Sequence, residues 1–465
     1  MSVASMTASS RLASIVGPAH VFSDSAELAA YDICGMVPAV IVQPGSPAEV
    51  AEIVKFAVAE KLALVPMGAR TKLVMGLPPR EYDLALDMTR LNRVVAYDPG
   101  DLTLSVEPGI RLRDLASVLT VHRQFLPLDV PFASQATVGG AIASGVDTAL
   151  RQMYGTARDY VLGMEFVTGE GVLAKSGGRV VKNVTGYDIH KLMIGALGTL
   201  GVITKINFRT FPVPASARAF AAEFENAEGA VEWRHRIARS PFRPLSLEVL
   251  SPGAAGILSG EAAARAVPDP IPSDLFSNRR WAFLAAFSGN GPVLERCERD
   301  LREMAEQCNA IRFSVLGNDE IAGASNRVRE FIPLSLRSSP AATVVKIAVL
   351  PTRLSEALAA AAKSSENNSL PWAAMARGLG VIYFALLPNA RSNETRRLVI
   401  QATDQILSEC SSLGGSAVVP WCPVEWKSNL KVWGLGRGDL DQMRKLKMVF
   451  DPHGVLSPGR FVGGV

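Results

Sequence analysis

The sequence predicts an α+β protein in which two α/β lobes are followed by a second α+β domain. Two observations predict this class. The first is a strand, capped helix, strand pattern near the start of the chain, which is typical of a βαβ unit. The second is a change of composition after residue 213, where Ala-rich helical stretches begin to alternate with β-like runs. With 465 residues, 48% of them hydrophobic and 20% charged, the chain can form several buried cores.

The βαβ unit begins at the short apolar run 40–42. Residues 46–49 read Ser-Pro-Ala-Glu, which is typical of a helix start: a capping serine, a proline in the first turn and a glutamate that can cap in return. The apolar positions of 50–58 recur at the spacing of one buried helical stripe. A second strand is expected over 62–65, where Pro66 ends it.

A second structural unit begins near residue 84, where two short apolar runs bracket a turn. Residues 102–107 alternate between apolar and polar types, which predicts a half-buried strand. Pro108 and Gly109 end that strand, and a helix is expected over 112–119. Residues 1–18 are small and polar and are expected to form a disordered tail.

Several classes of function are excluded by composition. The net charge of +4 is too dilute for a nucleic-acid-binding protein, and the run 444–447 is expected to be a solvated helical face. The five cysteines lie far apart without a CxxC pair, which argues against an iron–sulfur or zinc module and for a reducing compartment. No stretch is long and apolar enough to span a bilayer. No set of residues has metal-ligand spacing, so no metal site is predicted.

Glycine-bearing segments occur at four places in the first domain: 66–76, 136–145, 176–188 and 195–204. In the second of them, Thr137 can cap a helix, and Gly139 and Gly140 allow an anion to approach the backbone, so main-chain amides could seat a pyrophosphate. Taken alone, this segment is better explained as a tight turn into a buried helix. The first segment follows a strand, where α/β proteins bind ligands. None of the four is a GxGxxG or P-loop motif, but several loops around one extended ligand suit a dinucleotide.

The longest diagnostic runs are PAVIVQPGSPAEVAEIVKFA, VPMGARTKLVMG, LDMTRLNRVVAYDPGDLTLSVEPGIRLRDL, ATVGGAIASG, GTARDYVLGMEFVTGEGVL and GTLGVITKINFRTFP. In order, spacing and content they resemble the PCMH-type FAD-binding domain of vanillyl-alcohol-oxidase-like flavoproteins. The run GGRVVKNVTGYDIHKLMIGALGTLGVI is most similar to the smaller flavin subunit of bacterial glycolate oxidase, the E subunit. The C-terminal LKMVFDPHGVLSPGRF resembles the tail with which this family returns to the flavin.

The resemblance implies a two-lobed PCMH-type FAD-binding domain, an α+β cap domain for substrate or partner, and a tail that packs back on the FAD domain. The expected limits are 1–18 for the disordered tail, 19–213 for the FAD domain (lobes of about 19–95 and 96–213), 214–445 for the cap and 446–465 for the returning tail.

Carried over position by position, the resemblance implies that FAD is contacted by Pro66, Met67, Gly68, Ala69, Arg70, Thr71, Lys72, Gly76, Pro131, Ala136, Thr137, Val138, Gly139, Gly140, Ser144, Gly155, Asp159, Thr199, Gly201, Val202, Ile203 and Arg460. Three positions depart from the family pattern. Thr71 stands where many relatives carry the histidine that bonds the flavin covalently, so FAD is expected to be non-covalent. Arg70 replaces a glycine, which is expected to reduce access to the backbone. Ser457 replaces an asparagine, which weakens any contact expected from that side chain.

The reaction of glycolate oxidase, which the resemblance implies, is the oxidation of a 2-hydroxy acid, and it needs a cation that holds the substrate carboxylate. Lys346, in an otherwise apolar strand, is the candidate; the alternative is an edge strand whose lysine points into water. The resemblance implies an FAD-binding subunit of a glycolate oxidase-type complex, which converts glycolate to glyoxylate. A second flavin subunit and an iron–sulfur subunit would receive the electrons.

Two alternatives stay open: a non-catalytic flavin-binding assembly subunit, and a stand-alone FAD-dependent alcohol or hydroxy-acid oxidase. The expected location is the cytoplasm, with any attachment to a membrane made through partner subunits.

Overall fold

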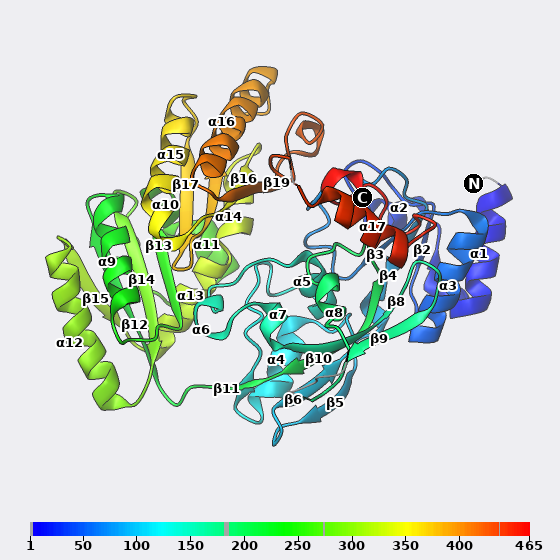
Figure 1. The fold of residues 1–465 in the computed structure, drawn as a ribbon, viewed down its shortest axis with the longest axis horizontal. Coiled ribbons are helices and arrows are strands. Elements are labelled where there is room, and N and C mark those ends of the chain that lie inside the picture. The colour runs from blue at the N-terminus through cyan, green and yellow to red at the C-terminus, as the bar shows by residue number, and fades with distance from the viewer. Residues whose placement is uncertain (1–2, 181–185, 273–274, 437) are drawn as a thin grey trace. The chain divides into compact units, whose positions relative to one another are not determined.

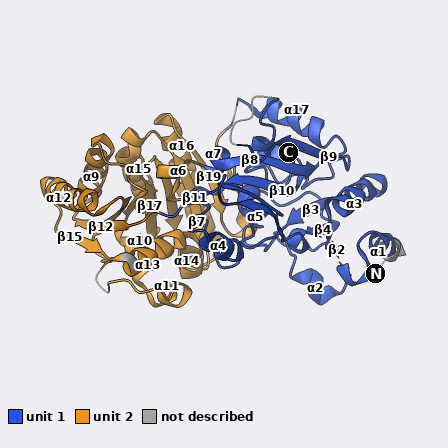
Figure 2. Ribbon diagram, turned by 90° about the horizontal axis from the view of Figure 1, so that it is seen from below, with its two compact units in different colours: residues 1–147, 156–213, 436–465 blue, residues 148–155, 214–435 orange. Residues whose placement is uncertain are grey.

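The structure is a computed structural model that describes residues 3–180, 186–272, 275–436 and 438–465. It divides into two compact units, unit 1 (1–147, 156–213 and 436–465) and unit 2 (148–155 and 214–435), as Figure 2 shows. Each unit combines helices with β-sheet, which confirms the predicted α+β class. Two limits differ from those expected. The short segment 148–155 belongs to unit 2, and the chain returns to unit 1 at Gly436.

The first sheet of unit 1 has four strands in the order β1-β2-β4-β3, all parallel except β1. The strands are β1 (Val21–Phe22), β2 (Val40–Val42), β3 (Leu64–Met67) and β4 (Leu84–Asp87). The helices beside them are α1 (Val3–Val16), α2 (Ser25–Ala29), α3 (Pro47–Glu60) and the 3-10 turns η1 (Pro18–His20) and η2 (Met88–Arg90). β2, α3 and β3 form the predicted βαβ unit, with β4 inserted between its two strands (Figure 1).

Helix α3 begins as the sequence predicts. Ser46 Oγ accepts a hydrogen bond from the Glu49 amide at 3.2 Å, and the Glu49 carboxylate accepts one from the Gly45 amide at 2.7 Å. The two side chains thus cap the first turn reciprocally. The face of α3 that packs into the core consists of Val50, Ala51, Ile53, Val54, Phe56 and Ala57.

The N-terminal segment is not the disordered tail that we expected. Most of it forms α1, which lies beside α3 (Figure 1). Leu12 and Val16 are buried in the core around α3, and the Arg11 guanidinium lies 4.8 Å from the centre of the Phe56 ring. The prediction is wrong because Leu12, Ile15 and Val16 pack against the core around α3, and these contacts dock a helix that otherwise consists mostly of small and polar residues.

The second sheet of unit 1 has five antiparallel strands in the order β5-β6-β10-β8-β9. Its strands are β5 (Val94–Asp98), β6 (Thr103–Val106), β8 (Val161–Val167), β9 (Leu173–Gly177) and β10 (Val202–Arg209), and β7 (Gln124–Phe125) pairs with β11 (Phe211–Pro212) nearby. The helices are α4 (Leu112–Thr120), α5 (Val138–Ser144), α7 (Ala157–Tyr160) and α8 (His190–Met193).

Strand β6 is buried on both faces, whereas its alternating pattern predicted a half-buried strand. The polar Ser105 is tolerated inside because its hydroxyl donates a hydrogen bond to Asn207 Oδ1 on β10 at 2.7 Å.

The C-terminal segment of unit 1 contains α17 (Leu440–Phe450) and η5 (Val462–Gly464). Between them the chain runs beside β3. The Leu64 amide donates to the Val455 carbonyl at 2.9 Å, and the Ser457 amide donates to the Leu64 carbonyl at 2.8 Å. The tail therefore extends the first sheet next to the strand that leads into the candidate site.

Unit 2 is built on an eight-stranded antiparallel sheet in the order β15-β12-β14-β13-β17-β18-β16-β19. The strands are β12 (Ala217–Phe224), β13 (Ser246–Leu250), β14 (Trp281–Ser288), β15 (Arg312–Leu316), β16 (Thr343–Ala348), β17 (Trp372–Arg377), β18 (Val381–Leu386) and β19 (Ser416–Trp421). The helices are α6 (Arg151–Tyr154), α9 (Ala227–Arg239), α10 (Pro252–Ser259), α11 (Glu261–Ala266), α12 (Gly291–Gln307), α13 (Asn318–Arg329), α14 (Phe331–Ser338), α15 (Leu354–Glu366), α16 (Asn393–Ser412) and the 3-10 turns η3 (Pro351–Arg353) and η4 (Val424–Trp426). Helices α12, α9, α15 and α16 contact one another in that order and form one layer on the sheet.

Within the described ranges, none of the helices combines the length and the apolar character that crossing a membrane requires.

Candidate functional site

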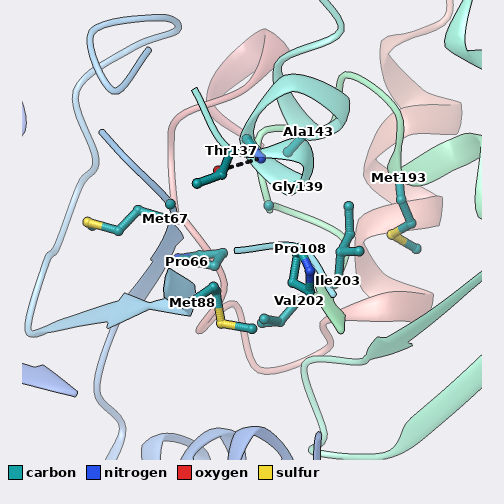
Figure 3. A pocket seen from close by; sticks show the side chains of 14 residues that line it. Pro66, Met67, Met88, Pro108, Thr137, Gly139, Ala143, Met193, Val202 and Ile203 are labelled. Atoms are coloured by element: carbon teal, nitrogen blue, oxygen red, sulfur yellow. Dashed lines mark hydrogen bonds between the residues drawn. The ribbon is translucent and has the colours of Figure 1, made fainter. Parts of the chain in front are cut away.

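Two adjoining cavities in unit 1 lie between the end of β3, the start of α5 and the segment before β10. The first holds about 470 Å³, part of it open to solvent, and Figure 3 shows its lining. Its apolar walls are formed by Pro66, Met67, Met88, Pro108, Ala143, Met193, Val202 and Ile203. Apolar walls with a few backbone groups between them suit a flat aromatic ring.

The second cavity, of about 500 Å³ including space open to solvent, shares Pro66, Gly68 and Thr137 with the first. It differs in that three cationic residues line it, namely Arg70, Lys72 and Arg460. A cationic cavity next to an apolar one suits an extended ligand that carries both an anionic group and a flat ring.

The loop after β3 offers main-chain donors to this second cavity. In the part of the chain that the structure describes, the amides of Gly68, Ala69, Arg70 and Thr71 donate no hydrogen bond. Consecutive unpaired amides in a turn are a common protein site for phosphate groups. Arg70 has a positive φ of 61°, and its guanidinium stacks on the Tyr31 ring, 4.2 Å from the ring centre. The Arg70 side chain is thereby anchored to a residue outside the loop.

A buried carboxylate holds this anchor. Asp87, at the end of β4, accepts hydrogen bonds from the Tyr31 hydroxyl at 2.6 Å and from Gln43 Nε2 at 3.0 Å, and it lies 3.9 Å from Arg70 Nη1. Burial and the hydrogen bond to Asp87 raise the pKa of Tyr31 to about 12, so the phenol remains a donor at neutral pH. Sequence reasoning missed Asp87 because its partners lie far away in the chain.

The start of α5 does not supply the amides that the sequence analysis expected. Thr137 caps the helix, its Oγ1 accepting from the Gly140 amide at 3.3 Å. The Val138 and Gly139 amides, however, donate to the carbonyls of Ile110 at 2.9 Å and Pro108 at 2.7 Å. The amides of these two residues are therefore already paired within the fold. Their segment reaches the cavities through Thr137, Gly139 and Gly140.

Glycines let the three segments of the site approach one another. A side chain at Gly68 would place Cβ 2.0 Å from Thr137 Oγ1, and one at Gly198 would place Cβ 2.5 Å from Pro66 Cγ. Gly198 also has a positive φ of 71°, which favours glycine. These glycines are needed for close packing of the loops, a role that sequence alone could not separate from anion binding.

Replacement of Gly68 by alanine is expected to weaken cofactor binding about tenfold or more. The new methyl group displaces Thr137, which removes the cap of α5, and a lost cap costs about 1 kcal/mol before any strain is added. Cofactor affinity of the purified variant, measured by titration of the apoprotein, tests this. Gly291→Ala is the matched control, because its Cβ would meet nothing within 4 Å. Equal affinity for the Gly68→Ala variant and the parent protein would contradict the prediction.

Arg460 reaches the second cavity from the C-terminal tail. The residue is 3% exposed, and its Nη2 donates to the Leu73 carbonyl at 2.5 Å and the Met75 carbonyl at 2.7 Å. Its Nε is buried and has no acceptor in the described structure. Burial lowers the pKa of Arg460, but arginine stays charged in proteins. An anionic ligand could accept a hydrogen bond from the Nε of this buried guanidinium.

The structure brings most of the predicted cofactor residues together. Those that line the two cavities are Pro66, Met67, Gly68, Ala69, Arg70, Thr71, Lys72, Thr137, Gly139, Gly140, Ser144, Gly201, Val202, Ile203 and Arg460. Those that do not line them are Gly76, Pro131, Ala136, Val138, Gly155, Asp159 and Thr199. Asp159 instead caps α7, its carboxylate accepting from the Thr156 amide at 2.6 Å. Sequence reasoning missed Met88, Pro108 and Met193, which carry no signal other than being apolar.

Lys346 lies in unit 2 on β16, between β18 and β19, so the alternative of an edge strand does not apply. It is half-buried and stands opposite Tyr383 on β18. Tyr383 has a further cationic neighbour, since the guanidinium of Arg377 lies 5.3 Å from the centre of its ring. Arg377 in turn lies 3.8 Å from the Glu248 carboxylate, and both side chains are buried.

A search of the described residues for groups of His, Cys, Asp or Glu that could hold a metal ion finds none.

Comparisons with known proteins agree with this architecture. The family model "FAD binding domain" matches residues 38–177, and the family model "FAD linked oxidases, C-terminal domain" matches residues 213–418 and 432–461. Among solved structures, 4-ethylphenol oxidase from Gulosibacter chungangensis in its isoeugenol complex superposes with a TM-score of 0.77 and 16% identity, covering 99% of this chain and 97% of that chain. At this level of identity, the likeness concerns the fold alone.

Two relatives with curated names are subunits of one kind of enzyme. The glycolate oxidase subunit GlcD of Bacillus subtilis (strain 168) is 25% identical over 426 residues, which cover 91% of this chain and 89% of that protein. The glycolate oxidase subunit GlcE of Escherichia coli (strain K12) is 34% identical over 200 residues, which cover 43% of this chain and 55% of that protein.

Proposed function

We propose that this chain, which belongs to the FAD-linked oxidase family, is the FAD-binding subunit of a glycolate oxidase-type enzyme that oxidises glycolate to glyoxylate. FAD is its cofactor, and the protein is an oxidoreductase that acts on CH–OH donors. The predicted resemblance to PCMH-type flavoproteins and to glycolate oxidase subunits is confirmed. The choice of glycolate, the residues of the site and the partners are our proposals.

The fit between FAD and the two cavities carries the proposal. FAD has a pyrophosphate between two ring systems. We assign the pyrophosphate to the cationic cavity, where the amides of 68–71 and the Arg460 Nε have no acceptor in the described chain. We assign one ring system to the apolar cavity beside Met88, Met193 and Ile203. Thr71 lines the cationic cavity in place of the histidine that bonds the flavin in many relatives, so the cofactor is held without a covalent bond.

The reaction class follows from the cofactor. When bound, FAD would accept a hydride from the carbon that carries the hydroxyl group, while the hydroxyl proton would pass to a base. In our proposal the Lys346 ammonium holds the carboxylate of the 2-hydroxy acid and so fixes the substrate. Its half-buried place on the inner strand β16 supports this role, because a charge-assisted hydrogen bond is strengthened where water is partly excluded.

We further propose that the chain works in an assembly with a second flavin subunit and an iron–sulfur subunit that receives the electrons. The support is that both relatives described above carry names of glycolate oxidase subunits. In this assembly the protein resides in the cytoplasm and meets a membrane only through its partners.

Reduction of the bound flavin by substrate tests the proposal. Under anaerobic conditions, glycolate is expected to bleach the visible absorption of the yellow protein, supplied with its partner subunits if the isolated chain is inactive. Lys346→Met is expected to retain FAD and to raise the half-saturating glycolate concentration about tenfold to a hundredfold, because a hydrogen bond to a charged group contributes about 1.5–3 kcal/mol.

Lys431→Met is the control for this experiment, since Lys431 pairs with Asp404 on the surface of the same unit. A yellow protein that no 2-hydroxy acid bleaches, with or without partners, would contradict the proposal and favour a non-catalytic assembly subunit. Full turnover by the isolated chain with oxygen would instead favour a stand-alone oxidase. An unchanged glycolate requirement in Lys346→Met would remove Lys346 from the site.

A further inference from the structure

A largely buried lysine of the C-terminal helix contacts the loop that borders the apolar cavity. Lys447, on α17, belongs to the run 444–447 that the sequence analysis expected to be a solvated face, but its side chain is only 11% exposed. Its Nζ donates to the Thr199 carbonyl at 2.8 Å, to the Leu456 carbonyl at 2.8 Å and to Asp451 Oδ2 at 2.6 Å. An ammonium group has three protons, so every donor of Lys447 is used.

Asp451 links Lys447 to the C-terminal tail. Its side chain is fully buried, and it accepts hydrogen bonds from the Val455 amide at 3.1 Å and the Leu456 amide at 2.9 Å, besides that from Lys447. These bonds shape the turn from which the tail runs beside β3 to Arg460. The carboxylate also offsets the cost of burying the ammonium: burial lowers the pKa of Lys447, whereas Asp451 raises it.

Thr199 is the contact of Lys447 on the side of the cavity. It lies between Gly198 and Gly201, which both line the apolar cavity. Its own amide and hydroxyl donate to the Ala196 carbonyl at 3.0 Å and 2.7 Å. Because the peptide group is planar, the bond to the Thr199 carbonyl also fixes the direction of the Leu200 amide, which has no acceptor in the described residues.

We propose that Lys447 is a positioning residue for FAD, which couples the returning tail to the loop 198–201. One ammonium holds the loop carbonyl at Thr199 and the tail carbonyl at Leu456 in a fixed relation, and the tail carries Arg460 into the cationic cavity. One side chain, which does not itself line either cavity, thus fixes the loop 198–201 and the tail relative to each other. This inference rests on the placement of FAD in these cavities and not on the identity of the substrate.

Titration of the apoprotein with FAD tests the inference. Lys447→Met is expected to weaken FAD binding at least tenfold, while the circular dichroism of the apoprotein is unchanged. The neighbouring Lys445→Met, on the exposed face of α17, is the matched control and is expected to bind FAD like the parent protein. FAD affinity of Lys447→Met equal to that of the parent would overturn the proposal.

Two further variants separate positioning from general stability. Asp451→Asn keeps an oxygen for the amides but removes the counter-charge, so a smaller loss of affinity, about threefold, is expected. The double variant Lys447→Met/Asp451→Asn is expected to bind no more weakly than Lys447→Met, because both residues act through one cluster. Additive losses would overturn the proposal.

Should Lys447→Met fail to fold, Lys447→Arg replaces it in the titration. This variant keeps the charge and is expected to lose FAD affinity at least threefold. Unchanged affinity would contradict the proposal.

These readouts do not involve the substrate. A protein that binds FAD but oxidises no 2-hydroxy acid would contradict the proposed function and leave the role of Lys447 standing.

Discussion

Replacement of Arg460 by methionine is expected to weaken FAD binding at least a hundredfold, so that the protein is purified without colour. Arg460 is almost completely buried, and its Nη2 holds the carbonyls of Leu73 and Met75. The change leaves both carbonyls without a donor, at a cost of about 1–3 kcal/mol each, and removes the cation that we assign to the pyrophosphate. Flavin content after purification and titration of the apoprotein measure the effect.

The control for this prediction is Arg80→Met. Arg80 also donates to a carbonyl of the tail, Gly464 at 2.6 Å, but it is exposed and does not line the cavities. Its loss is expected to change FAD affinity by less than about threefold, since an exposed interaction contributes little. Retention of a full complement of FAD by Arg460→Met would show that the pyrophosphate is not bound in the cationic cavity.

In unit 2, Arg377→Met is expected to lower the free energy of unfolding by about 3–5 kcal/mol. The variant removes a cation that lies 3.8 Å from the buried Glu248 carboxylate, and breaking a buried ion pair from one side has a cost of this size. The tryptophans provide a specific probe of unit 2, because all six of them lie there: Trp233, Trp281, Trp372, Trp421, Trp426 and Trp433. Urea unfolding followed by tryptophan fluorescence therefore measures the change.

The double variant Glu248→Met/Arg377→Met distinguishes loss of a charge partner from loss of packing. Replacing both members of a buried pair by apolar side chains is often neutral, so most of the lost stability is expected to return. If the double variant is as unstable as Arg377→Met, the cost arises from packing and not from the uncompensated carboxylate.

Local features of this protein could be predicted from sequence. The start of α3 depends on residues 45–49 alone, and its reciprocal caps form as expected. The strand pattern indicated the loop after β3, and the resemblance of the tail indicated Arg460; both line the second cavity. In each case the signal lies in a few consecutive residues.

Features that depend on distant partners could not be predicted. Residues 138–139 lie in a glycine-containing segment, as residues 68–71 do. The amides of Val138 and Gly139, however, donate hydrogen bonds to the carbonyls of Ile110 and Pro108, which come from another turn. The sequence around Lys447 is typical of a surface lysine, but in the fold its ammonium donates to the carbonyls of Thr199 and Leu456. The sequence of α1 is mostly small and polar, but in the fold its Leu12 packs into the core around α3.

By itself the sequence determined the α+β class and the start of α3, because cap motifs and strand periodicity lie in neighbouring residues. Its resemblance to known flavoproteins indicated the FAD-linked oxidase family and the segments that we assign to the cofactor. Only the tertiary structure decided which of the candidate amides are available to a ligand and which charged side chains are buried. The reason is physical: a main-chain donor or a buried charge is satisfied by whatever the fold places within about 3 Å, and those partners come from segments far apart in the chain.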